Sequence, residues 1–170
     1  MKEVSFRNDI LPLKDTLYRL ALRITLNKAE AEDIVQDTLI KVWNRRDSWA
    51  EMESVEAYSM TVCRNLSLDR IGRADNRTAS LDDSQSDRAD TSTSPLERAA
   101  QLDSIGIVRS LIDSLPEKQR SCIQLRDFEG RAYKEIAQVL GISEEQVKVN
   151  IFRARQAIKF KFQQYDNYGL

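Results

Sequence analysis

The chain has 170 residues, which allows one ordinary domain or two small ones, and its 26 basic and 27 acidic side chains leave a net charge of −1. It has no histidine, the commonest general base, and it shows no glycine-rich phosphate loop or nucleophile elbow, so we do not expect an enzyme. Glycine and proline are scarce and apolar residues nowhere keep a period of two, which predicts an all-α fold. No apolar run reaches membrane-spanning length and no signal peptide is visible, which favours a cytoplasmic protein without membrane insertion.

Apolar residues recur at helical spacing in the first part of the chain. They predict three helices, at residues 9–26, 28–46 and 54–73. Pro12 is expected in or near the opening turn of the first helix. Trp43 is expected in the core, and Trp49 is expected to anchor the loop at residues 48–54.

The two cysteines, Cys63 and Cys122, lie far apart, each among helical residues. Two isolated cysteines without histidine make no zinc site, so we expect neither a metal nor a cofactor. Buried, reduced thiols are the expected state, as in a cytosolic protein.

Residues 74–95 are rich in serine, threonine and aspartate, and Leu81 is their only large apolar side chain. Such a composition buries too little surface to offset the cost of ordering the chain. It predicts a flexible linker between a domain at residues 1–73 and a domain at residues 96–170. Each domain is barely large enough for a core of its own.

The second domain is predicted to begin with a helix at residues 96–114, introduced by Ser94 as N-cap and Pro95 at the first helical position. A further helix is predicted at residues 116–128. The charge of the chain changes along its length, which matters because affinity for phosphate depends on local charge. Residues 1–73 carry 12 basic and 12 acidic side chains, residues 74–97 carry 2 and 6 (net −4), and residues 98–170 carry 12 and 9 (net +3).

Residues 130–159 read as a helix, a tight turn and a second helix that ends in basic residues. The first helix is predicted at residues 133–140 and ends at Gly141, which adopts a left-handed C-cap without steric cost. Ser143 and Gln146 form a Ser-x-x-Gln capping box at the start of the second helix. The buried stripe of that helix is then Val147, Ile151, Ala154 and Ile158. A helix-turn-helix of this kind inserts its second helix into the major groove of DNA, whereas a basic face alone is more often simply solvated.

Three stretches, taken in order around an acidic linker, resemble the bacterial RNA polymerase sigma factors of the extracytoplasmic-function (ECF) type. They are residues 31–43 (AEDIVQDTLIKVW), residues 57–70 (AYSMTVCRNLSLDR) and residues 115–155, which open with LPEKQR and continue through FEG. The resemblance extends over residues 6–161. It implies a transcription initiation subunit whose partners are core RNA polymerase, promoter DNA and an anti-sigma factor.

In that family the first domain docks on the clamp coiled coil of the polymerase beta-prime subunit, and the beta flap is a second polymerase contact. The resemblance implies that Asp33, Gln36 and Asp37, about one helical turn apart, present the docking face. Without the resemblance, the same three residues read as an ordinary solvated helix face.

The resemblance also implies that the loop at residues 48–54 and the third helix capture an unstacked base of the minus-ten element. The matching positions on the helix are Tyr58, Thr61, Arg64, Asn65 and Asp69. Polar groups there would read a base edge, while cations would hold the backbone. The alternatives are that Tyr58 is a core residue and that Asp69 caps the helix or pairs with Arg73. The family usually has tryptophan at the position of Tyr58.

The second helix of the helix-turn-helix is, by resemblance, the reader of the minus-thirty-five element. The groove-facing positions are Lys148, Val149, Phe152 and Arg153, with Arg155 and Lys159 nearer the phosphates. Arginine or lysine can grip guanine with two hydrogen bonds, and an apolar side chain can contact a thymine methyl group. Val149 and Asn150 replace the serine and arginine of many relatives, which leaves the preferred base sequence open.

Two further questions stay open at the level of the sequence. The acidic linker either threads polymerase channels in place of nucleic acid, as the resemblance implies, or is a solubilising spacer. The rival functions are a stand-alone helix-turn-helix regulator, which would need a dimer surface to span two half-sites, and a helical adaptor that binds only proteins.

Overall fold

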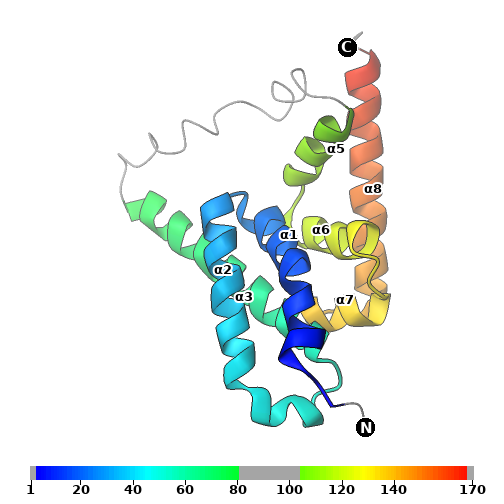
Figure 1. The fold of residues 1–170 in the computed structure, drawn as a ribbon. Coiled ribbons are helices and arrows are strands. Elements are labelled where there is room, and N and C mark those ends of the chain that lie inside the picture. The colour runs from blue at the N-terminus through cyan, green and yellow to red at the C-terminus, as the bar shows by residue number, and fades with distance from the viewer. Residues whose placement is uncertain (1–2, 81–103, 168–170) are drawn as a thin grey trace.

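The computed structural model of the chain describes residues 3–80 and 104–167 (Figure 1). Within these ranges, which we call the N-terminal half and the C-terminal half, the chain forms helices and short turns and contains no β-strand. The all-α fold expected from the sequence is confirmed. The rest of the predicted linker, at residues 81–95, and the predicted start of the next helix, at residues 96–103, lie outside the described residues.

The helix predicted at residues 9–26 is a regular α-helix only over Lys14–Thr25 (α1). A π-helical turn at Phe6–Ile10 and a 3-10 turn at Leu11–Leu13 precede it. Pro12 lies in the 3-10 turn, because proline has no amide hydrogen to donate to a preceding helical turn. The chain therefore enters α1 through a wide π-helical turn and then a tight 3-10 turn, and not as one continuous helix.

The next helix, α2, spans Lys28–Asn44. Its N-cap is Asn27, whose side chain accepts a hydrogen bond from the Glu30 amide at 3.0 Å. A 3-10 segment at Arg46–Glu51 then leads into α3, which spans Val55–Ser80. These elements match the two remaining helices predicted for the first domain, and they place the predicted base-capturing loop between α2 and α3.

The helix α3 continues beyond residue 73, where the sequence predicted its end, as far as Ser80. Its last seven residues belong to the stretch predicted as linker. Extending a helix that has already formed costs far less than starting one, which explains how polar residues without an apolar stripe can still be helical there.

The C-terminal half contains α5 at Ser104–Asp113, α6 at Glu117–Ile123, α7 at Tyr133–Leu140 and α8 at Glu144–Asn167. A π-helical turn at Gln124–Phe128 continues α6, so the helix predicted at residues 116–128 is helical but changes its winding part-way. The bounds of α7 are those expected from the sequence.

The turn between α7 and α8 has the predicted geometry. Gly141 has a φ of 67°, in the left-handed region, and its amide donates to the Ala137 carbonyl at 2.9 Å. The Ser143 amide donates to Gln146 Oε1 at 3.0 Å, and the Gln146 amide donates to Ser143 Oγ at 3.1 Å. This is the reciprocal capping box expected at the start of α8. Of the predicted stripe, Val147, Ile151 and Ala154 are buried and Ile158 is half-buried.

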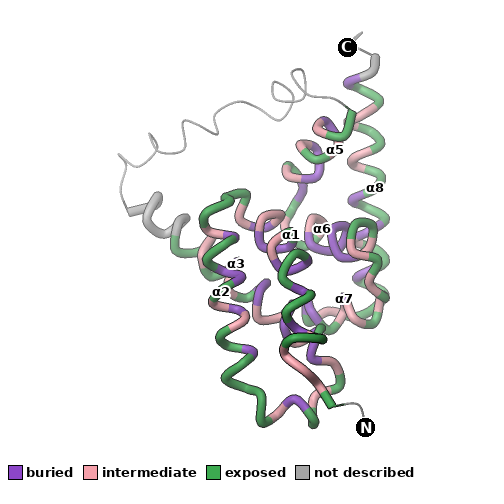
Figure 2. Tube along the Cα trace, in the orientation of Figure 1, coloured by how far each residue is buried: buried purple, intermediate pink, exposed green. Residues whose placement is uncertain are grey.

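The two halves do not have separate main cores, contrary to the sequence-based expectation. One apolar cluster includes residues of α1, α2 and α3 together with residues of α6, α7 and α8. In Figures 1 and 2 the buried parts of α1 and α3 face α6 and α7, while the outer sides of α2 and α8 are exposed. From the N-terminal half the cluster contains Leu17, Leu20, Met60 and Cys63 among others, and from the C-terminal half Cys122, Leu125, Ile136 and Val147 among others.

Trp43 differs from its prediction as a core residue, because 44% of it is exposed. Its ring meets Phe6 edge-on at 5.4 Å and Trp49 at 6.1 Å between centroids. Trp49 is buried, and its Nε1 donates to the Val42 carbonyl at 3.0 Å, so it anchors its loop as predicted. Cys63 and Cys122 are both buried free thiols, as expected.

Candidate nucleic-acid interface

An acidic face of α2 is held in place by one arginine of α3. The guanidinium of Arg70 forms ion pairs with Glu30, Asp33 and Asp37, the last at 3.3 Å. The hydrogen bonds that Arg70 donates to Asp33 and Glu30 raise the pKa of Arg70. Gln36, the third predicted docking residue, is exposed on the same helix. Three carboxylates around one cation leave a net negative surface whose side chains are already oriented.

The loop between α2 and α3 borders an open pocket of about 540 Å³. The pocket is lined by residues of the N-terminal segment, the loop and the first turn of α3: Glu3, Val4, Asp9, Trp49, Ala50, Met52, Glu53, Ser54, Val55 and Glu56. Four of these residues are acidic, so hydrogen-bond acceptors dominate its polar groups. The N-terminal segment was not predicted to take part. The Ser5 amide donates to Asp9 Oδ2 at 2.8 Å, and this local Ser-to-Asp pattern is the signal that could have revealed an ordered segment there.

The predicted minus-ten residues of α3 lie in different environments. Tyr58 is half-buried and packs on the cluster of Val42, Trp49 and Val55, so it is partly a core residue. Thr61 donates its hydroxyl hydrogen to the Ala57 carbonyl at 2.8 Å, which leaves its oxygen only as an acceptor. Asn65 is exposed, and Asp69 pairs with Arg73 at 2.8 Å.

Arg64 is the predicted minus-ten residue that is most covered, with 6% of it exposed. Its Nε and Nη2 donate to the two carboxylate oxygens of Glu117, at 3.0 and 2.9 Å. Glu117 belongs to α6, so a side chain expected to contact DNA is engaged by the other half of the molecule. Nothing in the spacing of α3 indicated this partner, because it lies 53 positions away in the sequence.

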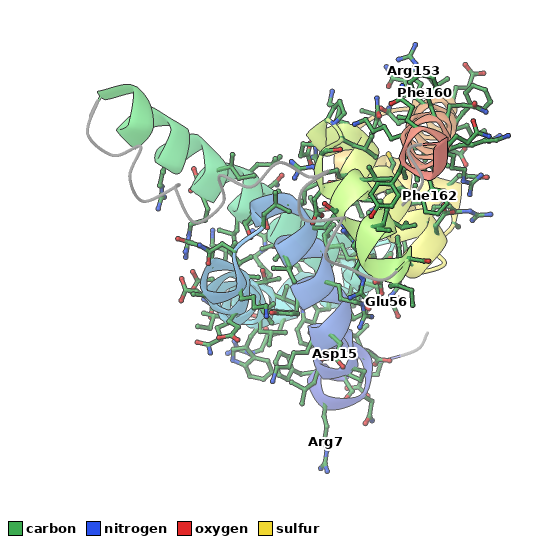
Figure 3. The ribbon with its side chains drawn as sticks, turned by 90° about the horizontal axis from the view of Figure 1, so that it is seen from above. Arg7, Asp15, Glu56, Arg153, Phe160 and Phe162 are labelled. Carbon is green, nitrogen blue, oxygen red and sulfur yellow. The ribbon has the colours of Figure 1, made fainter. Side chains whose placement is uncertain are left out.

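The predicted reading face of α8 is open to solvent. Lys148, Val149, Phe152, Arg153 and Lys159 are all exposed, Phe152 to 63%. In Figure 3 Arg153 and Phe160 lie at the outer margin of the molecule, away from α1 and α2. Arg155, expected near the phosphates, is instead paired with Asp127 through Nε to Oδ2 at 3.1 Å. That hydrogen bond raises the pKa of Arg155.

Five ion pairs join the two halves, and we call them together the interdomain contact. They are Arg19–Glu129 (2.7 Å), Arg23–Asp113 (2.8 Å), Arg64–Glu117 (2.9 Å), Arg131–Glu56 (2.8 Å) and Lys134–Glu53 (3.3 Å). Glu129 is held most firmly, because Thr16, Arg19 and Gln124 all donate to it. Burial opposes the ionisation of Glu129, but the hydrogen bonds and charge of Arg19 outweigh it and lower the pKa of the carboxyl. None of these carboxylates was singled out from the sequence.

Two family models match the chain, Sigma-70 region 2 over residues 10–77 and Sigma-70 region 4 over residues 105–158. The ECF RNA polymerase sigma factor SigL of Mycobacterium tuberculosis is 34% identical over 151 residues, which cover 87% of this chain and 83% of SigL. The chain belongs to the ECF family of RNA polymerase sigma factors. It binds core RNA polymerase and promoter DNA and directs the initiation of transcription.

A further relative agrees with this assignment, and two solved structures share the fold. The RNA polymerase sigma-H factor of Pseudomonas aeruginosa is 30% identical, with 88% of this chain and 83% of that protein covered. The sigma factor RpoE of Bartonella quintana, solved with the anti-sigma factor NepR, has a TM-score of 0.68 at 20% identity and covers 93% of this chain and 96% of that one. CnrH, solved with the cytosolic domain of CnrY, has a TM-score of 0.65 at 22% identity, with 91% and 85% covered. These two show the same fold.

In this sigma factor the region 2 match includes α1, α2 and most of α3, and the region 4 match includes the helix-turn-helix. Among its described helices, none is both long and apolar enough to cross a membrane. Over the same described part of the chain, no cluster of three or more cysteine, aspartate or glutamate side chains is arranged to hold a metal ion.

Proposed function

We propose that this sigma factor grips a promoter at two points. The C-terminal half reads duplex DNA at the minus-thirty-five element through α8, and the N-terminal half captures the melted minus-ten strand with α3 and the loop pocket. The observation that carries the proposal is the pairing of an exposed, capped recognition helix with an open pocket beside α3 in one chain.

The pocket supports base capture by its size and its polar groups. Its volume of about 540 Å³ falls within the range of small-ligand sites in proteins. Its carboxylates, such as Glu53 and Glu56, accept hydrogen bonds, as the exocyclic amino group of a flipped base requires. Exposed Asn65 offers both a donor and an acceptor on the neighbouring face of α3.

The exposed face of α8 supports groove reading. Arg153 and Lys148 can each approach base edges, and Phe152 and Val149 offer apolar surface to thymine methyl groups. Lys159 lies further along the helix, where it is suited to a phosphate contact. Arg155 can contact a phosphate in the same way only after its hydrogen bond to Asp127 is broken.

The acidic face of α2 supports docking on a basic surface of the polymerase beta-prime clamp. The side chains of Asp33 and Asp37 stay about half exposed, 55% and 45%, although Arg70 pairs with both, and exposed Gln36 lies on the same helix. Pre-oriented carboxylates lose less side-chain entropy on binding. A surface on region 4 for the beta flap belongs to the same proposal.

An anti-sigma partner is proposed from the solved structures. RpoE and CnrH, which share this fold, were solved with the anti-sigma factor NepR and with the cytosolic domain of CnrY. We extend to this sigma factor the idea of regulation by a separate protein, and we place its action in the cytoplasm with the polymerase.

Run-off transcription tests the proposal directly. Core polymerase is supplied with a library of randomised promoter fragments, with and without this sigma factor, and the transcribed templates are sequenced. We expect transcripts that depend on the sigma factor and share two sequence elements. A stand-alone regulator would protect DNA from cleavage without producing transcripts that depend on it, and a protein-only adaptor would produce neither transcripts nor protection. The absence of transcripts that depend on the sigma factor would refute the proposal in either case.

A further inference from the structure

We propose that Trp43 and Arg46 form a second contact for the melted promoter strand, in which a base stacks on the Trp43 ring and Arg46 holds the phosphate beside it. The inference rests on the function proposed above for the loop pocket, and it extends the path of the strand beyond that pocket. Neither residue was expected to contact DNA, since Trp43 was expected in the core.

The exposed ring of Trp43 provides the first step of the argument. Trp43 lies at the end of α2 and is 44% exposed. Its ring meets Phe6 and Trp49 edge-on, and Trp49 is buried, so the orientation of the exposed ring is supported from below. An aromatic ring held in this way loses little conformational freedom on binding. It can stack any base, because every base has a π-face.

Arg46 provides the second step. Its Cζ lies 4.7 Å from the centroid of the Trp43 ring, and its Nη1 donates to the Trp43 carbonyl at 3.2 Å. Both residues are exposed, and a cation–π contact at an exposed site is weaker than the stacking of a base on an aromatic ring. A base can therefore take the place of the guanidinium on the ring. The displaced arginine stays next to the ring, where it can pair with the phosphate of the same nucleotide.

The distribution of charge provides the third step. The loop pocket is lined by four acidic residues and no basic one, so it accepts the amino group of a base but repels the phosphates attached to it. Cations lie directly beside it. Residues 41–47 carry three exposed cations, Lys41, Arg45 and Arg46, against one acid, Asp47. Arg7, which follows Phe6, is exposed as well and points away from the ribbon in Figure 3.

The position of the aromatic surface provides the fourth step, because it adjoins the pocket. Trp49 lines the pocket, and its ring centroid lies 6.1 Å from that of Trp43. Its Nε1 donates to the carbonyl of Val42, the residue before Trp43, so the pocket wall and the exposed ring are tied together. In Figure 1 the end of α2, the 3-10 segment and the first turns of the chain lie together, far from the end of α8. A strand that leaves the pocket past Trp49 therefore meets Trp43 next.

The test uses core polymerase that carries the full-length sigma factor, bound to a promoter that the wild type transcribes in the run-off assay. Mismatched bases keep the minus-ten element of this promoter single-stranded. An abasic site, which removes a base but keeps its phosphate, is moved along the melted strand one position at a time. The variants are Trp43→Ala, Trp43→Phe and Arg46→Ala. The matched control is Lys28→Ala, which removes an exposed cation at the opposite end of α2.

We expect Trp43→Ala to weaken binding of the intact strand about tenfold, and Trp43→Phe to weaken it less than about threefold, because phenylalanine keeps a stacking ring. At one abasic position Trp43→Ala should cause no further loss, since the base that it stacks is already absent. The loss caused by Arg46→Ala should persist at that position, because the phosphate remains, and should shrink as salt is raised. The control Lys28→Ala should bind as the wild type does.

An equal loss for Trp43→Ala at every abasic position would overturn the inference, because the loss would then come from altered packing. In that variant Trp49 is the remaining tryptophan, and its fluorescence shows separately whether the loop stays packed. Since α2 also carries the docking residues, the affinity for core polymerase is measured for each variant.

Weaker binding to core polymerase with unchanged affinity for DNA would assign Trp43 to docking and overturn the inference, as would unchanged binding by every variant. Failure of the proposed function is a separate result, because it appears as the absence of transcripts with the wild-type sigma factor.

Discussion

Three arginines expected to contact DNA are in three different states. Arg153 is exposed at the margin of α8, Arg155 is paired with Asp127 on the surface, and Arg64 is buried against Glu117. The spacing of residues along a helix predicts that a cation lies on the side opposite the apolar stripe. It does not predict whether another element lies there, so the readiness of each arginine for DNA could be learned only from the structure.

Replacing Arg153 by alanine should cost about 1–3 kcal/mol of promoter affinity and relax preference at one base pair, because a base-edge contact is lost. Lys159→Ala should weaken binding to all sequences alike, since a phosphate contact carries no sequence information. The measurement is the affinity of the polymerase holoenzyme for promoters altered one position at a time. Equal losses on every promoter for Arg153→Ala would contradict its role as a base reader.

Acid should weaken the contribution of Glu129. Its pKa lies below the ordinary value of 4.5 because Arg19 favours the ionised form, even though burial opposes it. A carboxyl with a lowered pKa stabilises the folded state above its unfolded pKa and loses that contribution as pH falls through its folded value. The stability difference between the wild type and Glu129→Gln should therefore be full at neutral pH and shrink below pH 4.5.

Urea unfolding of both proteins across the acid range provides the measurement for Glu129. The difference between the two curves is needed because Glu135 acts in the opposite sense, its pKa being raised by burial. A difference that stays constant from neutral to acid pH would show that Glu129 is not the titrating group.

At the scale of the elements, local chemistry was enough to predict most of the helices. Ser143, Gln146 and Gly141 define the helix-turn-helix through bonds that reach no further than five residues along the chain, and the structure has them as expected. The misjudged ends, such as α3 running on to Ser80, lie where polar residues give neither a cap nor an apolar stripe. Helix extension there depends on what has formed before, which a local pattern does not contain.

The turn before α8 should depend on glycine at position 141. Its φ of 67° disfavours a side chain, so Gly141→Ala should destabilise the protein by about 1 kcal/mol. Gly72 lies in the body of α3, where an added methyl group meets nothing within 4 Å, so Gly72→Ala should stabilise by about 0.5–1 kcal/mol. Chemical denaturation of the two variants checks the opposite signs; the same sign for both would contradict this account.

At the scale of the whole molecule, the shared core was the main feature that the sequence did not predict. Periodicity shows which side of a helix is buried but not which helix buries it. The apolar stripes of α1 and α3 were recognised, yet part of their covering comes from residues such as Leu125 and Ile136, beyond a stretch of more than twenty residues outside the described structure. Likewise Arg19 and Glu129, 110 positions apart, carry no signal of their pairing.

A shared core should make the halves unfold together. Both tryptophans of the chain, Trp43 and Trp49, lie in the N-terminal half, so fluorescence reports that half alone, whereas circular dichroism reports all helices. Ile136→Ala, a fully buried change in α7, should cost about 2–5 kcal/mol and shift both transitions. The exposed control Ile105→Ala should shift neither by more than about 0.5 kcal/mol. A fluorescence midpoint unmoved by Ile136→Ala would mean that the halves are independent.

The helix α3 joins the acidic face of α2 to the interdomain contact over a short distance. Arg70 ties it to the acids of α2, and Arg64 ties it to Glu117 of α6. Arg64 and Arg70 are six residues apart on this helix, roughly 9 Å along its axis. A polymerase surface that draws the acids of α2 away from Arg70 would therefore displace α3 within two helical turns of the ion pair between Arg64 and Glu117. No loop lies between the two contacts to absorb the movement.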